Sequence, residues 1–143
     1  MRRIILLLLW SVGLWSCAGT GRYLGPTTHG YEFHASVFPS DLYLPSDLVS
    51  PQEFPTAATL LVHVHDVHGA PATGAPVMVQ FAGSECQGVI RLSAQQAVTA
   101  QGRASFTLRT ADTSGACRLA VRVDNVTQEL WVSVSPPPSR GSE

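Results

Sequence analysis

The sequence predicts an all-β domain, built as a sandwich of two antiparallel sheets with about seven strands. Three observations predict this class. Apolar and polar residues alternate with a period of two in successive segments, turn-forming residues separate these segments, and no segment shows helical periodicity over three turns. The chain has 143 residues, of which 45% are hydrophobic and 13% charged, so it can form one modest domain and is too apolar for a disordered protein.

The domain is expected over residues 30–135. Alternation is clearest in its second strand, where Leu60, Val62 and Val64 point to one face and the residues between them to the other. The same pattern of Val, Leu and Phe predicts the third strand and the last three. The seven expected strands cover residues 31–37, 57–65, 76–82, 89–99, 103–110, 117–124 and 128–135. The expected turns between them lie at residues 66–74, 82–88, 101–102, 112–115 and 124–125.

Residues 1–16 have the pattern of a signal peptide. Arg2 and Arg3 precede an apolar run that starts at Ile4 and continues to Leu14. The run ends sooner than the about 20 apolar residues that a membrane-spanning helix needs, so we expect cleavage and export. Cleavage leaves 7 basic and 10 acidic residues, a net charge of −3. This balance argues against a nucleic-acid partner.

Cys17 follows the signal peptide directly. The stretch Leu14-Trp15-Ser16-Cys17 resembles the bacterial lipoprotein box, in which an aliphatic and a small residue precede the cysteine that is lipidated, although Trp15 stands where a small residue is usual. The resemblance implies a lipid anchor on Cys17. Ala18 at the next position, in place of the Asp of inner-membrane retention, implies the outer membrane.

Two consequences follow for the N-terminal region. With lipidation, residues 17–29 form a flexible, glycine-bearing tether between membrane and domain. The alternative is ordinary secretory cleavage, because Ser16 and Ala18 also fit a small-x-small pattern. That cleavage releases Cys17 with the signal peptide and gives a soluble periplasmic or secreted protein. We favour the lipoprotein.

The turns and strands together carry a family resemblance. The motifs are Asp66-Val67-His68-Gly69-Ala70-Pro71, Gly74-Ala75-Pro76-Val77 and Thr99-Ala100-Gln101-Gly102-Arg103-Ala104, followed by a long strand, Gly115 and two closing strands. This order resembles the bacterial immunoglobulin-like domains of the invasin and intimin type. The first motif is also similar to a turn of the prealbumin-like domains attached to carboxypeptidases. The resemblance implies an immunoglobulin-like sandwich that serves in adhesion or envelope interactions.

A disulfide between Cys86 and Cys117 is expected from this topology. In such a sandwich the third and sixth strands are antiparallel neighbours, so the end of one lies beside the start of the other. Cys86 follows the third strand and Cys117 opens the sixth. An exported compartment permits the bond. Lipidation of Cys17 accounts for the odd cysteine.

A tandem repeat lies between the first two strands. Residues 39–44 and 45–50 both begin Pro-Ser-Asp-Leu, and the segment continues to Pro55. One interpretation is that its apolar residues cover a sheet edge. The other is that it binds a partner. We favour cover. The residues expected to contact a partner in the second case are Leu42, Tyr43, Leu44 and Phe54.

Histidines gather at the end of the second strand. His63 and His65 project to one side of that strand and His68 follows in the turn, so they are the candidate metal ligands, with copper or zinc as the ion. This row supplies too few ligands for a closed site. We therefore favour the alternative, a solvated outer face that carries polar residues.

No motif for catalysis or for a cofactor stands out. The sequence has no nucleophile in a strained elbow and no glycine-rich phosphate loop that opens a helix. We therefore predict a non-enzymatic, lipid-anchored envelope module for adhesion, protein interaction or spacing, with a protein or glycan partner. The alternatives are periplasmic metal binding and an accessory lipoprotein of an envelope assembly. Residues 136–143, which begin Pro-Pro-Pro, are expected to form a C-terminal tail.

Overall fold

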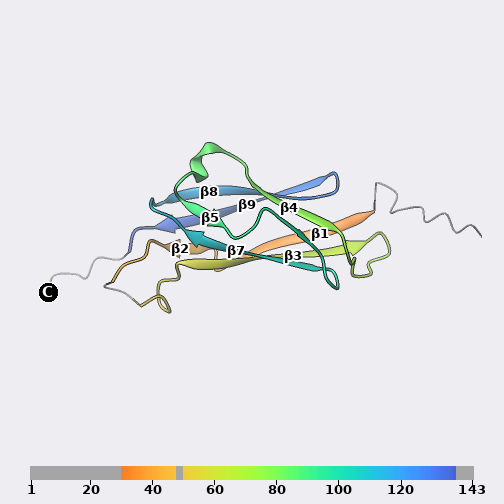
Figure 1. Ribbon diagram of the computed structural model, residues 1–143, viewed down its shortest axis with the longest axis horizontal. Helices are drawn as coiled ribbons and strands as arrows, with labels where there is room; N and C mark the ends of the chain where they lie inside the picture. Colours follow the sequence, from red (N-terminus) through yellow and green to blue (C-terminus); the bar gives the residue numbers. More distant parts are fainter. Residues whose placement is uncertain (1–29, 48–49, 138–143) are drawn as a thin grey trace, which may run out of the picture.

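Two β-sheets stacked face to face make up the part of the chain that the computed structural model describes, residues 30–47 and 50–137 (Figure 1). The four-stranded sheet has the order β1 (Tyr31–Phe38), β3 (Ala57–Asp66), β7 (Arg103–Thr110), β5 (Ile90–Leu92). The five-stranded sheet has the order β2 (Asp41–Tyr43), β9 (Val126–Ser135), β8 (Gly115–Val123), β4 (Pro76–Phe81), β6 (Gln96–Val98). The signal peptide, the lipidated Cys17 and the tether that we expect lie outside the described residues.

This architecture confirms the all-β, immunoglobulin-like two-sheet sandwich, but with nine strands where about seven were predicted. One extra strand, β2, lies inside the tandem repeat and pairs in parallel with β9. The other arises because residues 89–99 form two strands in different sheets. Ser93 N–H still donates to Thr107 of β7, whereas Gln95 C=O already accepts from Val79 of β4, so the chain changes sheets between these two residues.

The core lies between the two sheets, where the alternation predicted it. Leu60, Val62 and Val64 of β3 are fully buried, and each such side chain contributes roughly 1.5–3 kcal/mol relative to exposure. The outward residues between them are only partly covered. The other large, fully buried side chains come from both sheets: Leu42, Val77, Val79, Phe106, Leu108, Leu119, Val121, Val123 and Val132.

Gln128 of β9 closes part of the free edge of β1. Its Oε1 atom accepts a hydrogen bond from Ala35 N–H at 2.9 Å, and its Nε2 donates to Ala35 C=O at 3.1 Å. The side-chain amide therefore replaces a neighbouring strand in the middle of β1. An edge strand with its central groups occupied is a poor template for pairing with another chain.

Candidate interaction surfaces

The first half of the tandem repeat supplies β2, an edge strand of the five-stranded sheet. Leu42 is 0% exposed and belongs to the core, which corrects its expected place among the partner-contacting residues. Tyr43 N–H donates to Pro55 C=O at 2.9 Å, so the segment before β3 folds over β2. Tyr43 and Phe54 pack ring edge to ring face, with centroids 5.0 Å apart. Tyr43, Leu44 and Phe54 are half-buried.

The histidines lie on the outer face of the four-stranded sheet. His63 and His65 are partly exposed on β3, and register places His34 of β1 opposite His63. His68 lies in the exposed turn that follows, where its backbone N–H donates to Asp66 Oδ1. Within residues 30–47 and 50–137, no three His, Cys, Asp or Glu side chains are placed to hold one metal ion.

Asp66 organises the turn after β3. Its Oδ1 atom accepts hydrogen bonds from the backbone N–H groups of Ala70 at 2.9 Å and His68 at 2.8 Å. These two hydrogen bonds favour the ionised carboxylate and hold the pKa of Asp66 below its usual value of 3.8. The carboxylate therefore has a structural role in the turn.

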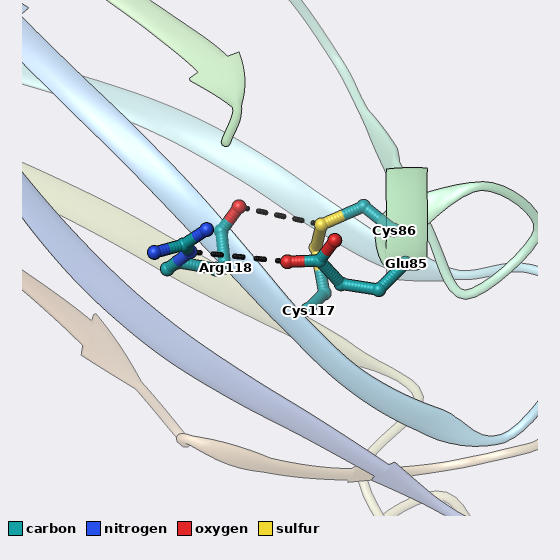
Figure 2. The surroundings of a disulfide bond; sticks show 4 residues. All are labelled: Glu85, Cys86, Cys117 and Arg118. Carbon is teal, nitrogen blue, oxygen red and sulfur yellow. Dashed lines mark hydrogen bonds and ion pairs between the residues drawn. A yellow bond between two sulfur atoms is a disulfide. The ribbon is translucent and has the colours of Figure 1, made fainter. Parts of the chain in front are cut away.

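The disulfide joins two parts of the five-stranded side of the sandwich (Figure 2). Cys86 lies in the short 3₁₀ turn η1 (Ser84–Cys86) after β4, and Cys117 lies near the start of β8. The pair bonds because β4 and β8 are antiparallel neighbours, with Phe81 opposite Leu119. The Cα atoms of the two cysteines are 4.6 Å apart, and both residues are buried. The disulfide predicted from the topology is present.

Arg118 follows Cys117 and gathers three side chains around it. Its Nη1 atom lies 3.3 Å from Glu129 Oε2. Its Nε atom lies 3.8 Å from Glu85 Oε1, the pair that Figure 2 shows. The guanidinium carbon lies 5.7 Å from the centroid of the Trp131 ring, in cation–π distance. Because Glu85 stands next to Cys86, the disulfide fixes the backbone that presents this carboxylate to Arg118.

Trp131 is an exposed aromatic residue that the sequence analysis did not name as a candidate for binding. It lies opposite Arg118 in the β8–β9 pair and is 60% exposed. We call the outer surface formed by Trp131, Arg118 and Glu129 the Trp131 face. A tryptophan at an outward position of a strand, between inward Leu130 and Val132, is the signal that could have indicated it.

A shallow apolar hollow lies at another edge of the same sheet. It has a volume of about 320 Å³ between β4 and β6. Its outer wall includes Met78 and Val98, and Val98 is among the most exposed large hydrophobic residues of the described chain. The five-stranded sheet thus presents two separate apolar features to solvent, Trp131 and this hollow.

Comparison with solved structures shows the fold. The D00-D0 domain of intimin matches with a TM-score of 0.56 and 18% identity, over 74% of this chain and 47% of that chain. A C-terminal fragment of intimin, solved in complex with the intimin-binding domain of the translocated intimin receptor, matches with a TM-score of 0.50 and 19% identity, over 71% and 32%. A β-glycosidase from Bacteroides vulgatus matches with a TM-score of 0.56 and 13% identity, over 73% and 14%.

These likenesses agree with the immunoglobulin-like fold of the intimin type that the sequence resemblance implies. The chain spans less than half the length of each of these three structures. No protein-family model matches the chain, and no curated protein does. Among the described residues, no helix has the length and apolar character needed to span a membrane.

Proposed function

We propose that this chain is a non-enzymatic interaction module of the bacterial cell envelope. In this proposal a lipid on Cys17 anchors the chain, and the Trp131 face binds a protein partner. Two features support it: a signal peptide followed at once by a lipoprotein-like cysteine, and a fold shared with domains of intimin, one of which was solved with a protein partner. A small part of a β-glycosidase has a similar fold, so the fold alone does not indicate the function. The proposal therefore depends on the residues that are exposed on the surface.

The single observation that carries the proposal is the exposed Trp131 ring beside Arg118. Tryptophan and arginine are the residue types most enriched among side chains that dominate binding energy at protein interfaces. Glu85 and Glu129 lie within ion-pair distance of Arg118. A side chain ordered in this way loses less conformational freedom when a partner binds.

The position of the N-terminus is compatible with an anchor and a free Trp131 face. β1 begins at Tyr31, which lies opposite Asp66 at the end of the sandwich that also carries the β3–β4 turn (Figure 1). The β8–β9 turn lies at the same end, because Val123 at the end of β8 pairs with Val77 near the start of β4. A tether that enters there leaves the outer sheet faces directed sideways from the anchor.

The anchor is tested by mass and by membrane partition. The mature wild-type protein should fractionate with membranes and carry a diacylglyceryl mass on Cys17. The variant Cys17→Ala should lose both. A soluble mature chain that begins at Gly19 contradicts the anchor and supports ordinary secretion.

The partner surface is tested by crosslinking and purification of the full-length protein from its own cells. We expect Trp131→Ala to reduce a captured protein at least tenfold, because truncation of a central tryptophan typically costs about 2 kcal/mol or more of binding. Phe38→Ala is the matched control, since Phe38 is 83% exposed on the opposite outer face. Capture that survives Trp131→Ala, or that Phe38→Ala removes equally, contradicts the assignment. If the wild-type protein captures no partner, the protein-binding assignment fails and the spacer function gains support.

A further inference from the structure

Two arginines face each other on the outer surface of the four-stranded sheet. Register places Arg91 of β5 directly opposite Arg109 of β7, and both side chains are exposed. Like charges at directly opposite positions destabilise a sheet. Asp112 lies 3.1 Å from Arg91 and balances it. Arg109 has no ion pair with any residue that the structure describes, so its guanidinium is available to an anion from outside.

These arginines border a hollow of about 440 Å³ between β5 and β7. We call it the arginine hollow, and its lining residues are Arg91, Leu92, Ser93, Thr107, Arg109 and Thr110. On the other side of β7, the neighbouring strand β3 carries small residues, with Ala57 opposite Arg109 and Thr59 opposite Thr107.

The hydroxyl groups in the hollow keep hydrogen-bonding capacity. Ser93 Oγ accepts from Thr107 N–H at 3.0 Å, which leaves its own O–H free to donate. Thr110 Oγ1 donates to Thr56 C=O at 3.2 Å and can still accept. Thr107 presents its hydroxyl on the exposed face beside them. The hollow therefore offers both donors and acceptors next to a guanidinium.

We propose that the arginine hollow binds an acidic sugar residue of a glycan, a pyranose that carries a carboxylate or a phosphate. The planar guanidinium of Arg109 suits two parallel hydrogen bonds to either oxyanion. Ser93 and Thr107 would form hydrogen bonds with the sugar hydroxyls. A bare inorganic oxyanion would use the guanidinium and leave most of the hollow and its hydroxyls empty.

This site goes beyond the proposed function and is independent of it. The arginine hollow and the Trp131 face lie on the outer sides of different sheets. Trp131→Ala should therefore leave glycan binding unchanged. Failure of glycan binding would remove the hollow as a site and leave the protein-partner proposal as it stands.

The test is a titration of the mature full-length protein, followed by backbone amide NMR shifts and calorimetry. The probes are a trigalacturonate, its neutral methyl ester, a hexose 6-phosphate and inorganic phosphate. We expect binding of at least one acidic sugar, with shifts centred on Ser93, Thr107 and Arg109. Arg109→Gln should weaken that binding about tenfold, the size typical of a lost charge-assisted hydrogen bond. The carboxylate and phosphate arms identify which oxyanion the site prefers.

The matched control is Arg103→Gln, which removes the same charge from the same face of β7 outside the hollow. It should change the affinity less than twofold. Equal losses in the two variants would show general attraction to a basic face and overturn the site. Equal binding of the methyl ester, or inorganic phosphate as good a ligand as the sugar, would overturn the acidic-sugar assignment. Absence of binding by every probe at low salt would overturn the proposal entirely.

Discussion

The two outer faces of the sandwich carry arginines in different ways. On the five-stranded sheet, Arg118 lies between two glutamates and a tryptophan ring, and Arg122 donates to Asp124 C=O at 2.8 Å. On the four-stranded sheet, Arg103 and Arg109 have no ion pair with the described residues. The first face is internally neutralised and presents an aromatic ring. The second face retains arginine side chains without an ion pair. Strand register therefore decides which charges remain available more than composition does.

The largest expected effect on stability comes from removal of the disulfide on the five-stranded side of the sandwich. Replacement of both Cys86 and Cys117 by Ser should lower the free energy of unfolding by about 4 kcal/mol, because the bond closes a loop with a sequence separation of 31. Urea unfolding of the variant and of reduced wild type should give the same loss. Release of η1 should also perturb the amide signals around Arg118 and leave those of β7 in place. A loss below about 1 kcal/mol would contradict the expected stabilisation by the disulfide.

The second prediction compares the edges of the two sheets. Leu42 on β2 is fully buried, so Leu42→Ala should cost about 3 kcal/mol through lost burial and the cavity left behind. Phe38 on β1 faces solvent, so Phe38→Ala should change the stability by less than about 0.5 kcal/mol. Thermal or urea unfolding measures both. Similar losses would contradict the burial of Leu42 in the core.

The third prediction compares two glycines with the same left-handed backbone. Gly102 precedes β7 with φ +75°, and Gly74 precedes β4 with φ +79°. A Cβ at Gly102 would lie 2.9 Å from Val64 O, whereas nothing lies within 4 Å at Gly74. Gly74→Ala should therefore cost about 1 kcal/mol for its backbone conformation alone, and Gly102→Ala about 2 kcal/mol or more. Equal unfolding midpoints would contradict the crowding at Gly102.

Local alternation predicted most of the fold and could not predict either candidate surface. The strand at residues 57–65 followed from periodicity, which is visible in the sequence. The disulfide followed from the positions of Cys86 and Cys117 together with the strand order of the expected sandwich. The prediction of a single strand over residues 89–99 missed the switch between β5 and β6. The alternation changes phase there, with two consecutive polar residues, Gln95 and Gln96, at the start of β6. The pairing of Trp131 with Arg118 and of Arg109 with Arg91 depends on register between strands 13 and 18 residues apart. The two-residue turn at residues 124–125, which the sequence predicts, sets the first of these registers. No local pattern sets the second, because β6 of the other sheet lies between β5 and β7 in the chain.

The smallest expected effect concerns pH at the end of the four-stranded sheet. The backbone hydrogen bonds of Asp66 lower the pKa of its carboxyl below 3.8 in the folded state, whereas the unfolded chain retains the ordinary value. A lowered folded pKa contributes stability that is fully present above pH 3.8 and is lost as the pH falls through the folded pKa.

Asp66→Asn is the matched control, because the amide oxygen can accept the same hydrogen bonds from His68 and Ala70 without titrating. Urea midpoints measured at neutral pH and at successive steps below pH 3.8 should fall more for the wild type than for Asp66→Asn. The difference should be small, since Asp66 lies in a solvent-accessible turn where water screens the charge. Parallel curves for the two proteins would mean that the turn does not depend on the charge of Asp66. A steeper fall in the wild type would show that the turn beside His63 and His65 responds to acid through its carboxylate.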